Sequence, residues 1–583
     1  MDECAKAHKN CPGLSFWADA KLPTRVIDVG LDGGEVRLRS SHDIDDRDAA
    51  RGYAALSYVW GMDQPKTMTY NVDERFESLT GVSLPQTIVD AIRTTRSLEI
   101  PYLWVDSLCI LQDSSDDMSM EISRMAQIYK SAIVTISAAK ANRCDEGFMQ
   151  PRERVLSILA SSPEVPFRLP DQVPQGPPRK KGILSRLLRR NDNDQHEASF
   201  GKVALCADMS CGHDLSKMTG HDITEPITKR AWTLQESWLS ARVLIYGEGP
   251  LRWKCLSGEK IDGYEPGSQF GLLSVIAENR QRFFPEKDNI PGNAESSSDL
   301  LSTVQSWRAG DHDIVRRWIS LVETFSKRNL TKPEDKLPAL SGIATEFHKI
   351  SQDDFYAGLW KSRMIEQLLW HQVNDDPPRG LPPSYRAPSW SWAAVEGGVS
   401  FSVDAPPSLS FLTLGAPPDA PDPARLMIHG CTTTIAEPLQ PFGRVVAGEL
   451  VLSAPARQMS WDEVGQRFDV YVGSQPNYFS DYIVLDGGAA SPLCASSVEA
   501  SQDISQRLQR FWFVELTRRE GPAGLVLVTN EDGKYKRVAY FRLGSREEIG
   551  NDAIEYEVGG GARKRPRQWD WEDGLLVKTM TIV

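Results

Sequence analysis

The sequence lacks the features of membrane-spanning and secreted proteins. No apolar run approaches the roughly 20 residues that a helix needs to cross a bilayer. Residues 1–4 are polar and charged, unlike the start of a signal peptide. The nine cysteines are an odd number and are scattered through 583 residues, which favours free thiols in a reducing compartment. These absences predict a cytoplasmic protein that makes no membrane contact.

An excess of positive charge is also missing. The chain has 66 basic and 79 acidic residues and a formal net charge of −13, which argues against a nucleic-acid-binding protein. The sequence contains no Gly-rich phosphate-binding loop, no G-x-S-x-G and no H-E-x-x-H. It therefore does not match the enzyme classes that these motifs identify, and no cofactor is predicted.

The chain is too long for one ordinary core, and its residue pattern changes twice. Residues 1–262 alternate strand-like and helix-like segments, which is the order of an α/β domain with a mostly parallel sheet flanked by helices. A Pro- and Arg-rich insertion interrupts them at about 151–200. Residues 263–385 carry apolar residues at helical spacing. Residues 386–583 contain short strand-like runs between turn residues, so we predict a β-rich C-terminal region.

Three segments of the N-terminal region carry the candidate functional residues. The first is residues 53–61, YAALSYVWG. Its apolar and aromatic composition predicts a buried strand that runs into a loop. Ser57, Tyr58 and Trp60 would then lie near the carboxyl end of that strand, where open α/β sheets bind ligands.

The second segment is residues 103–113, LWVDSLCILQD. Asp106 interrupts an apolar strand pattern, and a carboxylate there is costly unless it is paired or lies at the strand's end. Two interpretations stay open: Asp106 is functional, or it accepts hydrogen bonds from backbone amides of the following turn. The next apolar periodicity predicts a helix over residues 118–132, with Glu121 at its edge.

The third segment is residues 230–236, RAWTLQE. As a helix with Thr228 as its N-cap, it would bring Arg230, Trp232 and Glu236 together, because residues one turn apart share a face. A carboxylate beside a large aromatic ring can be desolvated and poised for chemistry. The alternative is a Trp that anchors the core beside a solvated Glu.

Cysteine and histidine occur together near the N-terminus. Cys4, His8 and Cys11 have the spacing C-x3-H-x2-C, which supplies three potential zinc ligands with no obvious fourth. The alternative is a short helix with these side chains on one face, and we favour it, so no metal site is predicted. A second, looser cluster consists of Cys206, Cys211 and His213.

In combination, the three segments resemble the signature blocks of the fungal heterokaryon-incompatibility (HET) domain, in the family's order, over about residues 50–245. Residues 337–344 and 388–392 are similar to sequences that often follow this domain in filamentous ascomycetes. The Pro-rich insertion and Leu111 are local departures. The resemblance implies a protein that recognises non-self after cell fusion, responds to an unknown protein partner and triggers cell death.

The HET domain is remotely similar to the Toll/interleukin-1 receptor (TIR) domain. Residues 56–58 resemble the first TIR strand with its Ser-Tyr pair. The offset from Trp232 to Glu236 is that of the TIR helix whose glutamate cleaves NAD. The resemblance thus implies a TIR-like fold, self-association, and cleavage of NAD, as a substrate, to nicotinamide and ADP-ribose.

In this hypothesis Glu236 is the catalytic carboxylate and Asp106 assists it. The substrate-binding candidates are Ser57, Tyr58, Trp60, Arg230, Trp232 and, as a weaker choice, Glu121. Two alternatives stay open. One is a non-enzymatic signalling or assembly module in which the motif residues are structural, and the other is a secondary-metabolism enzyme on the same scaffold.

Overall fold

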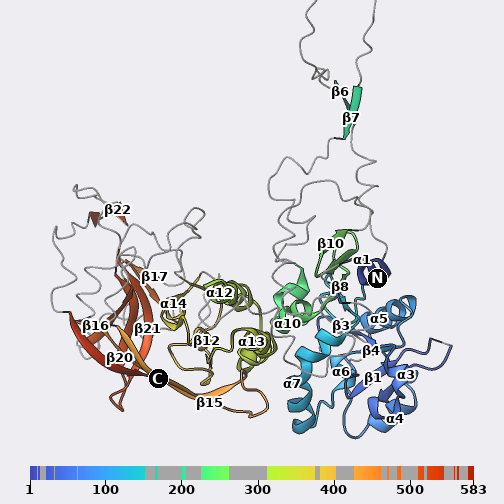
Figure 1. The fold of residues 1–583 in the computed structure, drawn as a ribbon, viewed down its shortest axis with the longest axis horizontal. Helices are drawn as coiled ribbons and strands as arrows, with labels where there is room; N and C mark the ends of the chain where they lie inside the picture. Colours follow the sequence, from blue (N-terminus) through green and yellow to red (C-terminus); the bar gives the residue numbers. More distant parts are fainter. Residues whose placement is uncertain are drawn as a thin grey trace, which may run out of the picture.

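The computed structural model is drawn in Figure 1. It describes residues 1–8, 11–12, 21–31, 33–61, 64–150, 164–168, 200–204, 225–261, 312–373, 381–401, 426–460, 469–471, 482–486, 510–517, 522–543, 557–558, 561–562 and 575–583. The cluster of Cys206, Cys211 and His213 lies outside these residues. So does most of the predicted insertion, of which only the antiparallel pair β6 (Glu164–Arg168) and β7 (Phe200–Ala204) is described. Among the described residues, every helix is too short or too polar to span a bilayer.

The N-terminal part is built around an eight-stranded mixed sheet in the order β10-β9-β8-β5-β3-β4-β1-β2 (Figure 1). Its strands are β1 (Arg25–Asp28), β2 (Arg37–Ser40), β3 (Tyr53–Ser57), β4 (Tyr102–Trp104), β5 (Val134–Ser137), β8 (Arg242–Ile245), β9 (Arg252–Cys255) and β10 (Gly258–Ile261). The four central strands run parallel, whereas both edges pair antiparallel. The expectation of a mostly parallel sheet therefore holds only at the centre. Short connections explain the antiparallel pairs β1–β2, β8–β9 and β9–β10. The antiparallel pair β1–β4 joins strands that are distant in the sequence.

Helices connect the parallel strands and cover the sheet. The main ones are α5 (Gln86–Ser97), α7 (Ser115–Ser131) and α10 (Trp232–Leu239), and the shorter ones are α1 (Asp2–Ala7), α3 (Asp46–Ala49), α4 (Val72–Glu77) and α6 (Asp106–Cys109). The second strand is shorter than the pattern suggested. It ends at Trp104, and Asp106 begins α6 instead of continuing the strand. Helix α10 packs on β3, β5 and α7, which puts Glu236 beside the carboxyl ends of the central strands.

The middle region is mainly helical and contains a cluster of buried aromatic side chains. Its elements are α12 (His312–Ser326), the 3-10 turn η7 (Pro333–Lys336), α13 (Pro338–Ser351), α14 (Met364–Leu368) and the strand pairs β11 (Phe355–Tyr356) with β12 (Leu359–Trp360) and β13 (Trp370–Gln372) with β14 (Val399–Phe401). Trp318 and Trp360 meet edge to face with ring centroids 5.5 Å apart, and both are buried. Aromatic packing of this kind is worth about 1 kcal/mol beyond its buried area.

The C-terminal part is a second large sheet in the order β15-β16-β19-β20-β21-β18-β17, with β24 against β16 and β21. Its strands are β15 (Met427–Ile435), β16 (Val445–Ser460), β17 (Asp469–Tyr471), β18 (Tyr482–Leu485), β19 (Arg510–Thr517), β20 (Ala523–Thr529), β21 (Tyr535–Arg542) and β24 (Leu576–Ile582), and a small pair is formed by β22 (Glu557–Val558) and β23 (Gly561–Ala562). The three regions thus have the predicted characters: mixed α/β, helical and β-rich.

Buried polar contacts join the regions to one another. Arg537 on β21 donates from Nε to Asp486 Oδ2 at 2.8 Å, and its Nη1 donates to Leu368 O at 2.7 Å in the middle region. Its guanidinium carbon lies 3.5 Å from the centroid of the Trp370 ring. On the N-terminal side, the Gly342 amide of α13 donates to Gln235 Oε1 of α10 at 2.9 Å. The helix that carries Glu236 is therefore tied to the middle region as well as packed on the sheet.

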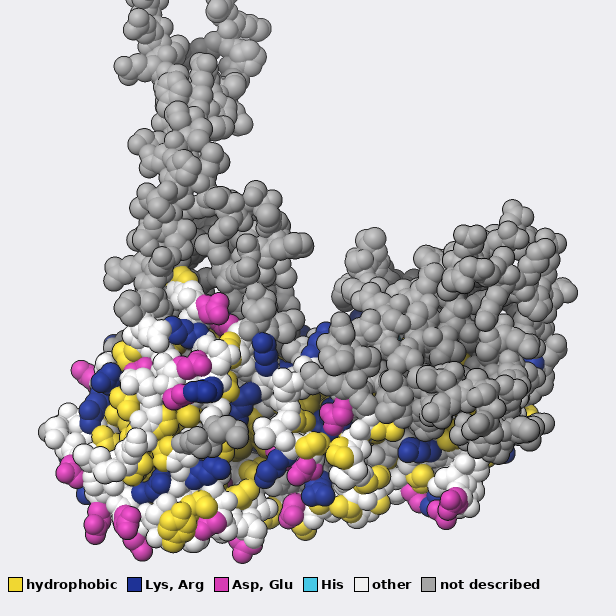
Figure 2. Space-filling model, turned by 180° about the vertical axis from the view of Figure 1, so that it is seen from behind, with side chains coloured by type: hydrophobic (Ala, Val, Ile, Leu, Met, Phe, Trp, Pro, Cys, Tyr) yellow, Lys and Arg dark blue, Asp and Glu magenta, His cyan; other side chains and the backbone are white. Residues whose placement is uncertain are grey.

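The surface that Figure 2 displays is mixed in charge. Over the described part of this face, basic and acidic side chains are interspersed with small apolar areas and do not gather by sign. Lysine and arginine side chains gather instead in the lining of a cavity.

Candidate functional site

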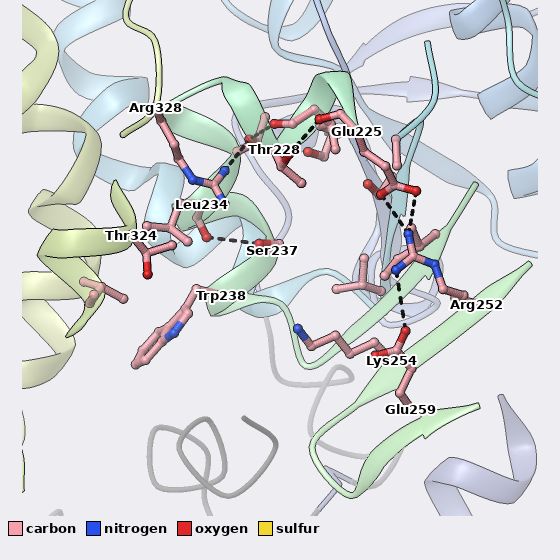
Figure 3. A pocket seen from close by; sticks show the side chains of 18 of the residues that line it. Glu225, Thr228, Leu234, Ser237, Trp238, Arg252, Lys254, Glu259, Thr324 and Arg328 are labelled. Atoms are coloured by element: carbon pink, nitrogen blue, oxygen red, sulfur yellow. Dashed lines mark hydrogen bonds and ion pairs between the residues drawn. The ribbon is translucent and has the colours of Figure 1, made fainter. Parts of the chain in front are cut away.

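A cavity of about 520 Å³ opens at the carboxyl ends of the central strands (Figure 3). Ser57 contributes from the end of β3, Ser137 from the end of β5 and Ile245 from the end of β8. One wall is the outer face of α10, including Ser237 and Trp238, and the opposite wall comes from α12 and the residues after it. The cavity therefore lies where α/β sheets commonly bind ligands.

The lining of this cavity carries more positive than negative charge. Arg252 is paired, since its Nη2 lies 2.7 Å from Glu225 Oε2 and its Nη1 lies 3.8 Å from Glu259 Oε1 (Figure 3). The further basic lining residues are Lys254, Arg316, Arg317 and Arg328. With both acidic lining residues engaged by Arg252, the cavity favours an anionic ligand.

Glu236 lies directly behind the α10 wall of the cavity. Its side chain is 2% exposed, and its Oε2 has no hydrogen-bond partner among the described residues. Burial raises the pKa of Glu236 to about 7, although the positive charge of Arg230 and the hydroxyl of Ser57 act in the opposite direction. A carboxyl group with this pKa is partly protonated near neutral pH, which is the property of many catalytic acids and bases.

Two cavity residues act on this carboxyl group. Ser57 lines the cavity and also interacts with Glu236. Burial lowers the pKa of Arg328 to about 10, and the nearby charge of Glu236 opposes that effect. The Arg328 Nη1 donates to Arg230 O and to Thr233 Oγ1, both at 3.1 Å. Glu236 is thus coupled to the cavity without lining it.

Arg230 is not on the helix as predicted. It lies in extended backbone after the 3-10 turn η4 (Pro226–Lys229), and α10 begins at Trp232 with Ala231 rather than Thr228 at its N-cap. The prediction is therefore wrong for Arg230, whereas Trp232 and Glu236 do lie one turn apart on α10. The backbone at Arg230 instead forms a parallel bridge with Asn329, which holds it extended.

The extended conformation lets Arg230 connect all three sequence segments. Its guanidinium donates to the backbone carbonyl of Tyr58 in the first segment. Its positive charge lowers the pKa of Asp106 in the second segment and of Glu236 in the third, in each case against the larger effect of burial. The convergence of the three segments is therefore electrostatic as well as spatial.

Asp106 and Trp60 are joined by a hydrogen bond, and the charge of Arg230 acts on Asp106. Asp106 Oδ2 accepts from Trp60 Nε1 at 2.8 Å, and its Oδ1 accepts from the backbone amide of Ser107 at 2.7 Å. Burial raises the pKa of Asp106. The Tyr58 hydroxyl donates to Gln64 Oε1 at 2.7 Å and is buried. These contacts hold the loop after β3, and none of the three side chains lines the cavity.

Trp232 and Glu121 lie apart from this group. The Trp232 Nε1 donates to Asp335 Oδ2 at 3.2 Å, so the ring is directed to the middle region. Glu121, on α7, accepts from Thr24 Oγ1 at 2.5 Å near β1, and burial raises its pKa. Sequence reasoning missed Arg328, for which no signal was available, because this residue follows α12 and is brought to the start of α10 by contacts with Arg230 and Thr233.

The mixed α/β sheet and the three converging segments define a HET-domain protein. The family model described as "Heterokaryon incompatibility protein (HET)" matches residues 53–236, so the chain carries a HET domain. Over 212 residues it is 33% identical to "Heterokaryon incompatibility protein 6, OR allele" of Neurospora crassa. That match covers 33% of this chain and 28% of the relative, so the chain spans less than a third of the curated protein's length. No solved structure matches the chain.

Proposed function

We propose that the HET domain of this protein triggers cell death by cleaving NAD to nicotinamide and ADP-ribose, with Glu236 as the catalytic carboxylate. One observation carries the proposal. A buried carboxyl group with a pKa of about 7 and a free Oε2 interacts with Ser57 and with the charge of Arg328, two residues that line a cavity at the strand ends. A buried carboxyl oxygen without a partner costs stability, so it is more easily explained by function than by folding.

The reaction breaks the bond between ribose C1′ and the nicotinamide nitrogen. The bonding electron pair moves to the pyridinium nitrogen, so nicotinamide leaves as a neutral molecule and needs no proton. The ribose becomes an oxocarbenium-like cation, water adds at C1′, and one proton is released. The main barrier is the positive charge on the ribose, and an ionised carboxylate held in a water-poor site is suited to stabilise it.

The cavity supplies groups for the rest of the substrate. The pyrophosphate of NAD is anionic, and Arg316, Arg317 and Arg328 would pair with its oxygens. Ser57 would hold the Glu236 carboxyl toward the ribose hydroxyls, while Asp106 and Trp60 keep the loop after β3 in place. Because Glu236 is 2% exposed, its side chain must rotate into the cavity when the ribose binds.

A second candidate function is a non-enzymatic assembly module, and a specific observation favours it. Glu236 does not itself line the cavity, and Trp232 and Arg230 make contacts that hold the structure together. In this case the motif residues keep the domain folded, and death follows from association with a partner.

Nicotinamide release distinguishes the two functions. Purified full-length protein is incubated with NAD over a range of protein concentrations, because activity that needs self-association rises with concentration. We expect Glu236→Gln to reduce release by about 100-fold or more, as for loss of a group that stabilises transition-state charge. Glu121→Gln is the matched control, since Glu121 is equally buried, also has a free Oε2 among the described residues and lies away from the cavity.

Turnover should survive in Glu121→Gln. Absence of nicotinamide release by the wild type at every concentration, or full release by Glu236→Gln, would remove the catalytic proposal. Cell killing by Glu236→Gln without loss of cellular NAD would support the assembly module instead.

A further inference from the structure

Four potential metal ligands lie together where the N-terminal segment contacts strand β9 of the sheet. Cys4 and His8 belong to α1 and its C-terminal cap, Cys11 follows, and Cys255 is the last residue of β9. The Sγ atoms of the three cysteines and a ring nitrogen of His8 all lie within 4.8 Å of one another. The spacing Cys4, His8, Cys11 lacked an obvious fourth ligand, and the fold supplies Cys255.

The two distances from His8 to cysteine sulfurs fit a tetrahedral zinc ion. His8 Nδ1 lies 3.4 Å from Cys255 Sγ and 3.7 Å from Cys11 Sγ. With Zn–S of about 2.3 Å and Zn–N of about 2.0–2.1 Å, tetrahedral angles separate a ligating nitrogen and sulfur by about 3.6 Å. The two measured distances bracket that value. All three cysteines are free thiols.

The surroundings of the cluster suit thiolate ligands. Cys4, Cys11 and Cys255 are buried, with 3%, 0% and 1% exposure. Arg242 on β8 donates from Nε to Cys4 Sγ at 3.2 Å, and Ser257 Oγ lies 3.5 Å from Cys11 Sγ. Three thiolates and a neutral imidazole give a divalent ion a net negative charge, which the buried guanidinium offsets, and such outer contacts orient the ligands of metal sites.

We propose that Cys4, His8, Cys11 and Cys255 bind a structural zinc ion. Four protein ligands close the coordination shell and leave no open position for catalysis. The ion joins the N-terminal segment to the β9–β10 hairpin, whose Arg252, Lys254 and Glu259 line the cavity. Among the described residues, the other polar links of this segment include an exposed Glu3–Lys260 ion pair and the bond from Arg242 Nη2 to Pro12 O at 2.6 Å.

Zinc content of the full-length protein tests the site directly. The chain is purified under reducing conditions without chelators, and its metal is measured by inductively coupled plasma mass spectrometry. We expect one zinc ion per chain in the wild type and background levels in Cys255→Ser. Cys144→Ser is the matched control, because Cys144 is another buried free cysteine of the same region outside the cluster, and it should keep the full zinc content.

A second measurement does not depend on the folding of a variant. The wild type is stripped of metal with a chelator and reconstituted with Co²⁺, which gives thiolate-to-cobalt charge-transfer absorption and the strong visible bands of a tetrahedral site. Wild-type protein that holds no zinc and gives no such spectrum would overturn the proposal. So would zinc retained by Cys255→Ser, or a disulfide between two of these cysteines found by mass spectrometry of the protein purified without reductant.

Discussion

Replacing Glu236 with Gln should stabilise the folded protein at high pH and have a much smaller effect at low pH. Burial raises the pKa of this carboxyl group to about 7 from an ordinary value of 4.5. Since one pKa unit corresponds to about 1.4 kcal/mol, the difference between these two values amounts to about 3 kcal/mol of unfolding free energy. Glutamine has a similar shape and no charge at any pH.

The sign follows from proton binding. The folded state binds the Glu236 proton more tightly than the unfolded state, because the folded-state pKa is the higher one. Ionisation therefore opposes folding. This penalty is absent below about pH 4.5, grows between about 4.5 and 7, and is constant above. The stability advantage of Glu236→Gln over the wild type should accordingly increase by about 2.5 kcal/mol between pH 5 and pH 8.

Urea unfolding followed by tryptophan fluorescence at pH 5, 6, 7 and 8 measures this difference. Glu346→Gln is a control of opposite sign. Burial acts to raise the pKa of Glu346. Ion pairs with Lys130 Nζ at 2.7 Å and Lys349 Nζ at 2.8 Å outweigh burial, so the pKa of Glu346 is lowered. Burial also lowers the pKa of Lys130. Loss of Glu346 should therefore cost stability at neutral pH, and the cost should shrink as pH falls through its lowered pKa.

A stability difference for Glu236→Gln that stays constant from pH 5 to pH 8 would refute the argument. A difference that becomes more unfavourable as pH rises would show that Arg230 holds the carboxylate ionised in the folded protein. Either outcome would also remove the electrostatic basis for Glu236 as a group poised near neutral pH.

Two further variants test contacts outside the carboxyl group. Arg537→Met leaves Asp486 buried without its partner and should lower stability by about 3–5 kcal/mol, with part of the loss recovered in the double variant with Asp486→Asn, as measured by thermal unfolding. Trp232→Phe removes one hydrogen bond to Asp335 and should lower the free energy of unfolding by about 1 kcal/mol, with NAD turnover unchanged. A large loss of turnover at normal stability would mean that the indole contacts the substrate.

Strand and helix periodicity located most of the N-terminal elements. The pattern of residues 53–61 predicted β3, and the periodicity of residues 118–132 predicted α7. The errors have local causes. Asp106 accepts from the Ser107 amide and starts α6, so the second strand ends early. Alternation of elements does not reveal that β1 pairs antiparallel with β4, a strand distant from it in the sequence.

The candidate site was less accessible to sequence reasoning. Motif resemblance proposed Glu236, Ser57 and Arg230 as site residues. Helical spacing misplaced Arg230, which a backbone bridge to Asn329 holds in extended conformation. Arg328 and Cys255 reach their clusters from distant parts of the chain. Periodicity describes one element at a time, so contacts of this kind appear only once the elements are packed.

The residues that set the pKa of Glu236 do not all lie within the HET match. The match stops at Glu236, inside α10, whereas Arg328, which acts on that carboxyl group, comes from beyond it. Proteins that share the matched portion and diverge afterwards inherit the acid without inheriting the neighbouring cation. The pKa of the same glutamate can then differ from one of them to the next, and similarity over a third of a chain does not predict it.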